Sequence, residues 1–348
     1  MTAPRETLLS VVIPAYNEEE SLHECHKRLT GVLSQLDMDY ELVFVNDGSR
    51  DRTLEILSQL QQQDSHVSVV DLSRNFGKEI ALSAGLDMAD GDAVVVIDAD
   101  LQDPPELIPT FVSEWRKGFD VVYAQRTERK GEGFVKKATA SMFYRLMGKL
   151  TRIQMPRDTG DFRLLSRRAV LAMRRFREQH RFMKGLFAWI GFSTKAVPYK
   201  RDGRFAGTTK WNYWRLWQLA IEGITSFTTV PLQFSMYIGL FTAFGAFVYG
   251  GYILVRTLIF GNDVPGYPSL VVIVLFLGGV QLAAIGVLGE YLGRIFNESK
   301  QRPLYFVNTY TPAHSAQAAR ARGARQAIPA EEAANTLERT VALNTHRR

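Results

Sequence analysis

Three aspartates lie within six residues of one another in the run DADLQDPPE, at residues 98 to 106. Carboxylates held as closely as those of Asp98, Asp100 and Asp103 repel one another unless a cation or basic groups compensate. Carboxylate oxygens are ligands that hard divalent ions take in proteins, so the D-x-D pair Asp98 and Asp100 are candidate ligands for Mg²⁺ or Mn²⁺. Such an ion would stabilise a diphosphate as it departs. A solvated acidic turn that caps the following helix is the structural alternative.

The first 125 residues alternate between short β-branched runs and helical patterns. The runs lie at 9–13, 41–45, 67–72 and 93–97, and the helical patterns lie at 18–36, 51–63 and 78–89. This repetition predicts an α/β fold with a mostly parallel sheet and helices on both faces. Ligands of such sheets bind beyond the carboxyl ends of the strands, so function is expected in the residues just after each strand.

The first strand is followed by PAYNEEE, at 14 to 20, where a dinucleotide-binding fold would carry a glycine-rich turn. Neither GxGxxG nor GxxxxGK[ST] occurs in the chain, so these two phosphate-binding loops are excluded. Pro14, Tyr16 and Glu18 are candidate nucleotide contacts. Asn17 and the acids after it also suit the start of a helix, which explains these residues without a ligand.

Asp47 follows the second strand in VNDGS, as Asp98 follows the fourth. Its carboxylate could accept a hydrogen bond from a nucleotide base, or it could cap the helix expected to begin near Asp51. On residue type alone the cap is favoured. Both aspartates are expected at the same edge of the sheet.

Two stretches near the carboxyl end, 231–255 and 267–288, contain no Asp, Glu, Lys or Arg. Each exceeds the roughly 20 residues that a helix needs to cross a bilayer, so they predict a transmembrane hairpin rather than buried core helices. Basic residues flank the pair on its outer sides, and the linker has only Arg256 at its edge. This bias predicts that both termini lie in the cytosol.

Two further segments are typical of helices that lie in a membrane interface. Residues 134–150 set apolar and basic side chains on different helical sides, and Trp211, Trp214 and Trp217 precede the first span. Core-facing stripes are the alternative. The predicted organisation is a catalytic domain at 1–210, an interfacial helix at 211–230, two transmembrane helices within 231–292 and a cytosolic segment at 293–348, mostly disordered after about 313.

Composition is compatible with one α/β core and an attachment. Lys and Arg exceed Asp and Glu by 42 to 36, which membrane-flanking segments and a basic tail explain without nucleic acid. Cys25 is the only cysteine, so neither an intramolecular disulfide nor a cysteine-based metal site can form, and a buried inert thiol is expected. The amino-terminal apolar run ends at Pro14 and predicts a strand, not a signal peptide.

Together these segments resemble the family 2 inverting glycosyltransferases, in the polyprenyl-phosphate branch that includes dolichyl-phosphate mannose synthase and bactoprenol glucosyltransferase. The matching segments are VVIPAYNEEE at 11–20, VNDGSRDRT at 45–53, LSRNFGKE at 72–79, DADLQDPPE at 98–106, DTGDFRL at 158–164 and RFAGTTKW at 204–211. Six matches in order over about 200 residues are far more specific than any one of them.

The resemblance implies a GT-A type, Rossmann-like sheet followed by interfacial amphipathic helices and a transmembrane hairpin. It implies the transfer of one sugar from a nucleotide-sugar donor to a polyprenyl phosphate, with inversion and with Mg²⁺ or Mn²⁺. UDP-glucose and undecaprenyl phosphate are the first choices, with UDP-aminoarabinose, UDP-N-acetyl sugars and GDP-mannose as alternative donors. A homo-oligomer is expected, and a catalytically inactive membrane scaffold is the alternative of a different class.

The resemblance also implies roles for the candidate residues. The nucleotide would contact Pro14, Tyr16, Glu18, Asp47, Lys78 and Asp98, and the metal would be held by Asp98, Asp100 and Gln102, whose amide is a neutral oxygen donor. The basic residues Lys78, Arg126, Arg204 and Lys210 would gather around the phosphates of donor and acceptor, where an arginine can clamp a phosphate with two parallel hydrogen bonds and a lysine acts as a point charge. Without the resemblance, each of these basic residues is equally well interpreted as a solvated surface cation. Asp161, in DTGDFRL, is the candidate for orienting the acceptor or acting as a base, with Arg163 paired to it or to a phosphate. A buried Asp–Arg ion pair is the structural alternative. An acceptor phosphate is already anionic near neutral pH, so base catalysis is dispensable.

Overall fold

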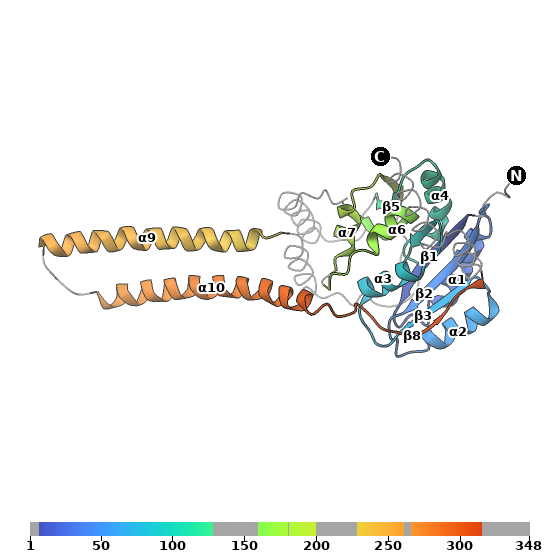
Figure 1. The fold of residues 1–348 in the computed structure, drawn as a ribbon, viewed down its shortest axis with the longest axis horizontal. Helices are drawn as coiled ribbons and strands as arrows, with labels where there is room; N and C mark the ends of the chain where they lie inside the picture. Colours follow the sequence, from blue (N-terminus) through green and yellow to red (C-terminus); the bar gives the residue numbers. More distant parts are fainter. Residues whose placement is uncertain (1–6, 128–158, 180, 200–227, 261–265, 315–348) are drawn as a thin grey trace, which may run out of the picture.

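The computed structural model describes residues 7–127, 159–179, 181–199, 228–260 and 266–314 (Figure 1). Within them, eight strands form one sheet in the order β7-β5-β6-β4-β1-β2-β3-β8. The strands are β1 (Leu8–Ala15), β2 (Asp39–Asn46), β3 (Val67–Leu72), β4 (Ala93–Val96), β5 (Val121–Arg126), β6 (Thr159–Ser166), β7 (Thr194–Tyr199) and β8 (Val307–Thr311). The first four match the predicted strands to within two residues.

The predicted mostly parallel α/β sheet is confirmed. Parallel pairing joins β1 to β2 and β4, β2 to β3, and β5 to β7. Strand β6 is inserted antiparallel between β4 and β5, and β8 lies antiparallel to β3 at the far edge. Because β6 runs in the opposite direction, its first residues lie at the edge where β4 and β5 end.

The helices of this part are α1 (Leu22–Leu33), α2 (Thr53–Gln63), α3 (Lys78–Met88), α4 (Ile108–Arg116), α6 (Arg167–Met173) and α7 (Met183–Trp189), with a 3₁₀ turn at Pro105–Leu107. The prediction that a helix starts at 18 was wrong. Asn17 adopts a positive φ of 53°, and its side chain accepts the N–H of Arg50, so residues before Leu22 form a turn that contacts the loop after β2.

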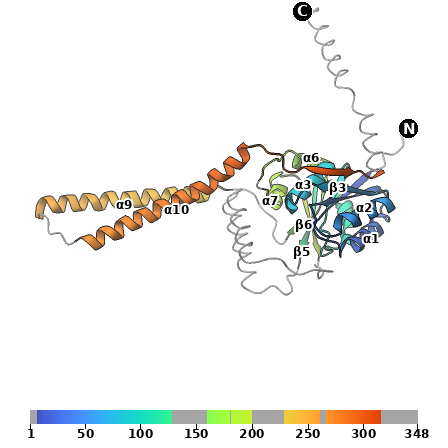
Figure 2. The same ribbon diagram turned by 90° about the horizontal axis from the view of Figure 1, so that it is seen from below.

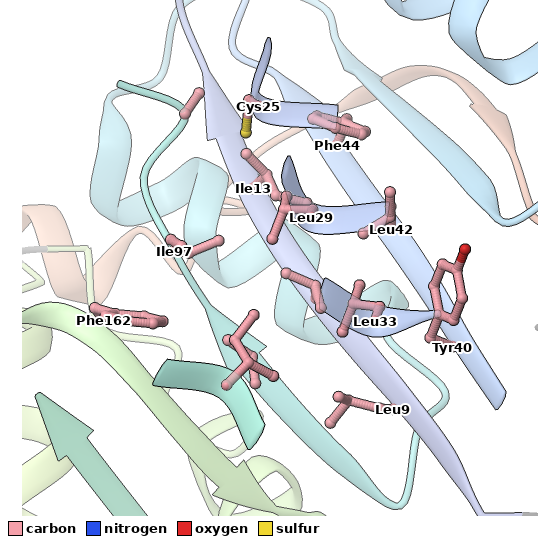
Figure 3. Close-up of a cluster of buried hydrophobic side chains, with 14 of the residues drawn as sticks. Leu9, Ile13, Cys25, Leu29, Leu33, Tyr40, Leu42, Phe44, Ile97 and Phe162 are labelled. Atoms are coloured by element: carbon pink, nitrogen blue, oxygen red, sulfur yellow. The ribbon is translucent and has the colours of Figure 1, made fainter. Parts of the chain in front are cut away.

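Both faces of the sheet are covered, which is why the strands read as continuous apolar runs. Side chains alternate between the faces, so Ile13 and Phe44 pack under α1 and α2 (Figure 3), while Val12 and Val45 pack under α3. Cys25 is fully buried in the first core, and burial raises the pKa of its thiol to about 12. The expectation of a buried thiol is confirmed.

Helix α3 approaches the sheet closely at Gly85. A Cβ there would lie 2.3 Å from Val12 Cγ1 and 3.0 Å from Val45 Cγ2. Gly85→Ala is therefore expected to lower the free energy of unfolding by about 1–3 kcal/mol, because the strand side chains cannot move aside without disturbing the core. Thermal unfolding in detergent measures this loss. Gly31→Ala is the matched control: nothing lies within 4 Å of its Cβ position on α1, so that variant should be at least as stable as the wild type.

Two long helices, α9 (Val230–Phe260) and α10 (Tyr267–Ser299), lie side by side and project away from the sheet (Figures 1 and 2). Each contains one of the predicted apolar stretches, and both are long and apolar enough to cross a membrane. No described residue in the most apolar stretch of either helix is buried, so the two helices differ from core helices. The predicted interfacial segments, 134–150 and 211–230, lie outside the described residues except for the last three positions of the second.

The chain returns from α10 to the sheet, although no pattern in the sequence predicts a strand there. Strand β8 pairs with β3 and adds one strand to that side of the sheet. The N–H of Ser73 donates to the carbonyl of Phe306 (3.0 Å), and the Asn308 amide donates to Asp71 (2.9 Å). Beyond β8, the N–H of His314 still bonds to the carbonyl of Ser65. The base of the helical pair is thus tied to the sheet through β8. The tail expected to be disordered lies almost wholly outside the described residues.

Candidate active site

The candidate site lies at the edge of the sheet where β1, β2 and β4 end. Asp98 follows β4, as the sequence predicts. Asp161 reaches the same edge because β6 is antiparallel to β4, with Arg163 opposite Val96. Two carboxylates far apart in the sequence are therefore brought together by the reversed direction of one strand.

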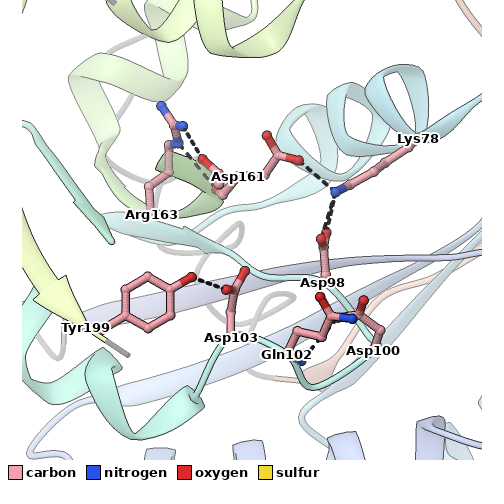
Figure 4. Close-up of polar contacts among 9 residues, drawn as sticks. Lys78, Asp98, Asp100, Gln102, Asp103, Asp161, Arg163 and Tyr199 are labelled. Carbon is pink, nitrogen blue, oxygen red and sulfur yellow. Dashed lines mark hydrogen bonds and ion pairs between the residues drawn. The ribbon is translucent and has the colours of Figure 1, made fainter. Parts of the chain in front are cut away.

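Lys78 bridges these two carboxylates (Figure 4). Its ammonium lies 2.7 Å from Asp98 Oδ1, donates to Asp98 Oδ2 at 2.8 Å and donates to Asp161 Oδ2 at 2.7 Å. Lys78 is the first residue of α3 and its side chain is 44% exposed, whereas the Asp161 side chain is 11% exposed. The bridge reduces the repulsion between the two carboxylates.

The pKa values of the two bridged carboxylates are shifted in opposite directions. Burial raises the pKa of Asp98, and Lys78 compensates only in part. Burial also raises the pKa of Asp161, but the charges of Lys78 and Lys184 outweigh it and hold that pKa well below its usual range. Asp161 therefore stays ionised near neutral pH, which makes it a weak proton acceptor.

The loop after β4 turns sharply at Leu101. This residue adopts a positive φ of 56° although it is not glycine, and its side chain is 2% exposed, so burial holds a strained backbone in place. The turn sets Asp98, Asp100 and Gln102 near one another (Figure 4), with the Gln102 N–H donating to Asp100 Oδ1 at 3.2 Å.

These donors fit a divalent ion that brings other ligands with it. No group of three or more His, Cys, Asp or Glu among the described residues could hold a metal ion. The loop can supply the two carboxylates of Asp98 and Asp100 and the amide oxygen of Gln102. Mg²⁺-type sites commonly use one or two carboxylates and complete their coordination with water and substrate phosphates.

A second network of polar side chains lies beside the Lys78 bridge. Arg126 Nε donates to the hydroxyl of Tyr199 at 3.2 Å, and that hydroxyl donates to Asp103. A Cβ on Gly160 would lie 3.2 Å from Arg126 Nη2 and 3.6 Å from Asp103 Oδ2. The lack of a side chain at Gly160 therefore lets these two polar groups lie close to the backbone that precedes Asp161. The acidic run in the sequence includes Asp103 but predicts no role for it, and no sequence pattern singles out Tyr199.

Arg163 is buried and supports the backbone. Its guanidinium donates to the carbonyls of Gly160 (2.8 Å) and Asp161 (3.3 Å) and lies 3.8 Å from the ring centroid of Phe187. Burial lowers its pKa to about 10. The carboxylate of Asp161 pairs with Lys78 instead, so the buried Asp–Arg ion pair considered for this segment is not formed.

Asp47 holds the loop that leads into α3. Its carboxylate accepts the N–H groups of Phe76 (2.7 Å) and Gly77 (2.9 Å), one residue before Lys78. Burial raises the pKa of Asp47, and these bonds oppose the shift. The favoured interpretation of Asp47 as the cap of α2 was wrong, because Asp51 accepts the N–H of Thr53 at that helix start.

The remaining candidates divide into two groups. Pro14 is buried in β1, Tyr16 is 38% exposed just beyond it, and Glu18 accepts the hydroxyl of Ser21 at 2.8 Å. These residues lie at the same edge as Asp98 and Asp47. Arg204 and Lys210 lie outside the described residues.

Glu79 is a neighbour of the site that no motif in the sequence assigns a role. Its Oε2 atom is buried without a hydrogen-bond partner among the described residues. Burial, and then the charge of Asp161, raises the pKa of Glu79 to about 7, although Lys78 and Lys184 oppose the shift. The only sequence signal was its place beside Lys78 in FGKE.

Wild type is expected to lose stability as pH rises from about 4.5 to about 7, and Glu79→Gln is expected to lack this loss. A carboxyl whose pKa is raised by folding keeps a proton that the unfolded chain has released, so it lowers stability as pH rises from about 4.5 to about 7. Thermal unfolding midpoints of wild type and variant, compared between about pH 5 and pH 8, test this difference. Glu114→Gln is the control, because folding lowers the pKa of that carboxyl and it stays ionised in this range. Parallel pH profiles for wild type and Glu79→Gln would contradict the assignment.

Comparisons with known proteins identify the family. The family model described as glycosyl transferase family 2 matches residues 10–173. An uncharacterized glycosyltransferase, sll0501 of Synechocystis sp., is 53% identical over 86% of this chain and 94% of its own length. The bactoprenol glucosyl transferase of Shigella phage SfV is 49% identical over 86% of this chain and 97% of its own length.

A solved structure also resembles the chain. Glucosyl-3-phosphoglycerate synthase from Mycobacterium tuberculosis, in complex with Mn²⁺, UDP-glucose and phosphoglyceric acid, is 22% identical, with 63% of this chain and 78% of that chain covered and a TM-score of 0.43. The sequence relatives are much more similar and extend past the family model through the helical pair. On that similarity over most of both chains, the protein belongs to glycosyl transferase family 2.

Proposed function

We propose that the protein transfers one glucose from UDP-glucose to undecaprenyl phosphate with inversion, releasing UDP. The observation that carries the proposal is the cluster of Asp98, Asp161 and Lys78 at the carboxyl edge of the sheet, on a chain with two helices fit to cross a membrane. The relatives named bactoprenol glucosyl transferase support this acceptor and sugar, since they match the chain over nearly their whole length.

The donor would bind along the ends of β1, β2 and β4. In this proposal Pro14, Tyr16, Glu18 and Asp47 contact the nucleoside, and Asp98, Asp100 and Gln102 hold Mg²⁺ or Mn²⁺. When bound, such an ion neutralises charge on the departing diphosphate. Arg126, Arg204 and Lys210 are proposed as the phosphate contacts that orient donor and acceptor.

The acceptor side would be organised by Asp161. Its lowered pKa argues against a role as a base, and a phosphomonoester with a second pKa near 6 carries its own negative charge at neutral pH. We assign Asp161 an orienting role: it holds Lys78, and Arg163 fixes the backbone on which Asp161 stands. Most of the rate would then come from positioning and electrostatic stabilisation.

The helical pair would place this chemistry at the membrane. We infer that α9 and α10 cross the inner membrane with the catalytic part and both termini in the cytosol, as the flanking basic residues favour. The interfacial segments 134–150 and 211–230 would then lie at the headgroups. The homo-oligomer stays a prediction.

The test is a transfer assay with purified protein in detergent. Mn²⁺ and undecaprenyl phosphate are incubated with radiolabelled UDP-glucose, UDP-aminoarabinose, UDP-N-acetylglucosamine or GDP-mannose, and label is counted in the lipid phase. Label from UDP-glucose alone is expected. Label from another donor would replace the sugar in the proposal, and the absence of lipid label with folded protein would favour the inactive scaffold.

A further inference from the structure

The bridge from Lys78 occupies the carboxylate that is proposed to bind the metal. Both oxygens of Asp98 lie within 2.8 Å of the Lys78 ammonium. A divalent ion would bind a carboxylate oxygen at about 2.0–2.2 Å, so ion and ammonium would compete for the same lone pairs and repel each other. The two contacts cannot both persist unchanged.

The surroundings of Lys78 allow its side chain to move without its backbone. Asp47 holds the preceding loop through the N–H groups of Phe76 and Gly77, so the start of α3 is anchored. The Lys78 side chain is 44% exposed, and its four-carbon stem is flexible. Movement of the ammonium away from Asp98 therefore requires no change in the fold.

A second acceptor is ready for the ammonium on the far side. Lys78 donates a hydrogen bond only to Oδ2 of each aspartate, and Asp161 Oδ1, like Asp98 Oδ1, is buried without a hydrogen-bond partner among the described residues. A buried carboxylate oxygen without a partner is costly, and a shift of the ammonium toward Asp161 would satisfy it.

We infer that Lys78 is an exchangeable counter-cation: its ammonium neutralises Asp98 in the donor-free enzyme, and a divalent ion at Asp98 displaces it toward Asp161. This inference rests on the metal assignment in the proposed function. It makes Lys78 a positioning residue, because the arriving ion changes how firmly Asp161 is held. A lysine that served only as a phosphate ligand would not oppose the binding of the metal alone.

The experiment measures binding of Mn²⁺ alone to the full-length protein in detergent, by the electron paramagnetic resonance signal of free Mn²⁺. Lys78→Gln is expected to bind Mn²⁺ about tenfold more tightly than wild type, which corresponds to ~1.4 kcal/mol, because the ion no longer displaces an ammonium. Without Mn²⁺ the variant should unfold at a lower temperature than wild type, and Mn²⁺ should restore most of that loss.

Two control variants separate displacement of the Lys78 ammonium from a general effect of charge. Lys78→Arg keeps the charge and should bind Mn²⁺ like wild type, whereas Lys184→Gln removes a nearby charge that also acts on Asp161 and should change the affinity less than about twofold. Equal tightening by Lys184→Gln would overturn the inference, because the effect would then be a general change in field. Equal or weaker binding by Lys78→Gln would also overturn it.

Asp98→Asn distinguishes this failure from failure of the proposed function. If wild type does not bind Mn²⁺, or if Asp98→Asn still binds it, the metal assignment itself is wrong. Should Lys78→Gln not fold, the wild-type structure with Mn²⁺ and UDP decides: the inference expects Lys78 Nζ beyond hydrogen-bond distance of both Asp98 oxygens, and a retained contact would overturn it.

Discussion

Asp100→Asn is expected to lower the rate of sugar transfer about 100- to 1000-fold while the protein stays folded. Asp100 is half-buried on the strained turn at Leu101, and its Oδ1 accepts the N–H of Gln102. An asparagine oxygen can accept the same bond, so the turn should survive. The lost charge would weaken the hold on a divalent ion, which the proposed chemistry needs at the departing diphosphate.

The measurement combines label transfer to lipid at saturating UDP-glucose with thermal unfolding of the same preparation. Asp39→Asn is the matched control, since Asp39 begins β2 at the opposite edge of the sheet and should affect transfer little. A folded Asp100→Asn protein with near-normal turnover would remove Asp100 from the metal site.

Asp161→Asn is expected to lower the rate about 100-fold by the same factor at every pH from about 6 to 8. Lys78 and Lys184 hold the pKa of Asp161 well below its usual range despite burial, so its charge is constant in that interval. The stability that this lowered pKa contributes is present above the unfolded value of 3.8 and is lost only as pH falls through the folded value. The expected loss of rate therefore reflects orientation and charge, not a lost proton acceptor.

The pH dependence of the transfer rate, measured for wild type and variant, distinguishes the two roles. If Asp161 acted as a base with a pKa in this interval, the wild-type rate would show an ascending limb that the variant lacks. Asp37→Asn, at an exposed position, controls for the loss of one carboxylate. A variant with wild-type activity would exclude Asp161 from the reaction.

The periodicity of the first 125 residues was sufficient to predict the sheet edge on which the candidate site lies. Four β-branched runs separated by helical patterns leave few arrangements other than parallel strands covered on both faces. Asp98 and Asp47 follow two of those strands, so their place at one edge was predictable. The apolar stretches of α9 and α10 were equally clear, because a run of that length without charge has few other uses.

The contacts of the same residues were not predictable, because they depend on partners distant in the sequence. Asp47 looked like a helix cap, yet it bonds the backbone before α3. Arg163 looked like a partner for the Asp161 carboxylate, yet it bonds carbonyls. Local spacing gives residue types and their order, but hydrogen-bond partners are chosen by whichever groups the fold brings within about 3 Å.

Local periodicity and composition are enough to predict the α/β repetition, the acidic turn after the fourth strand and the two apolar helices. The antiparallel direction of β6, the meeting of Asp161 and Asp98 across Lys78, and the return of β8 to the sheet beside β3 come from the folded chain alone. Strand direction and edge pairing depend on long-range backbone hydrogen bonds and on burial of both sheet faces, which no local pattern encodes.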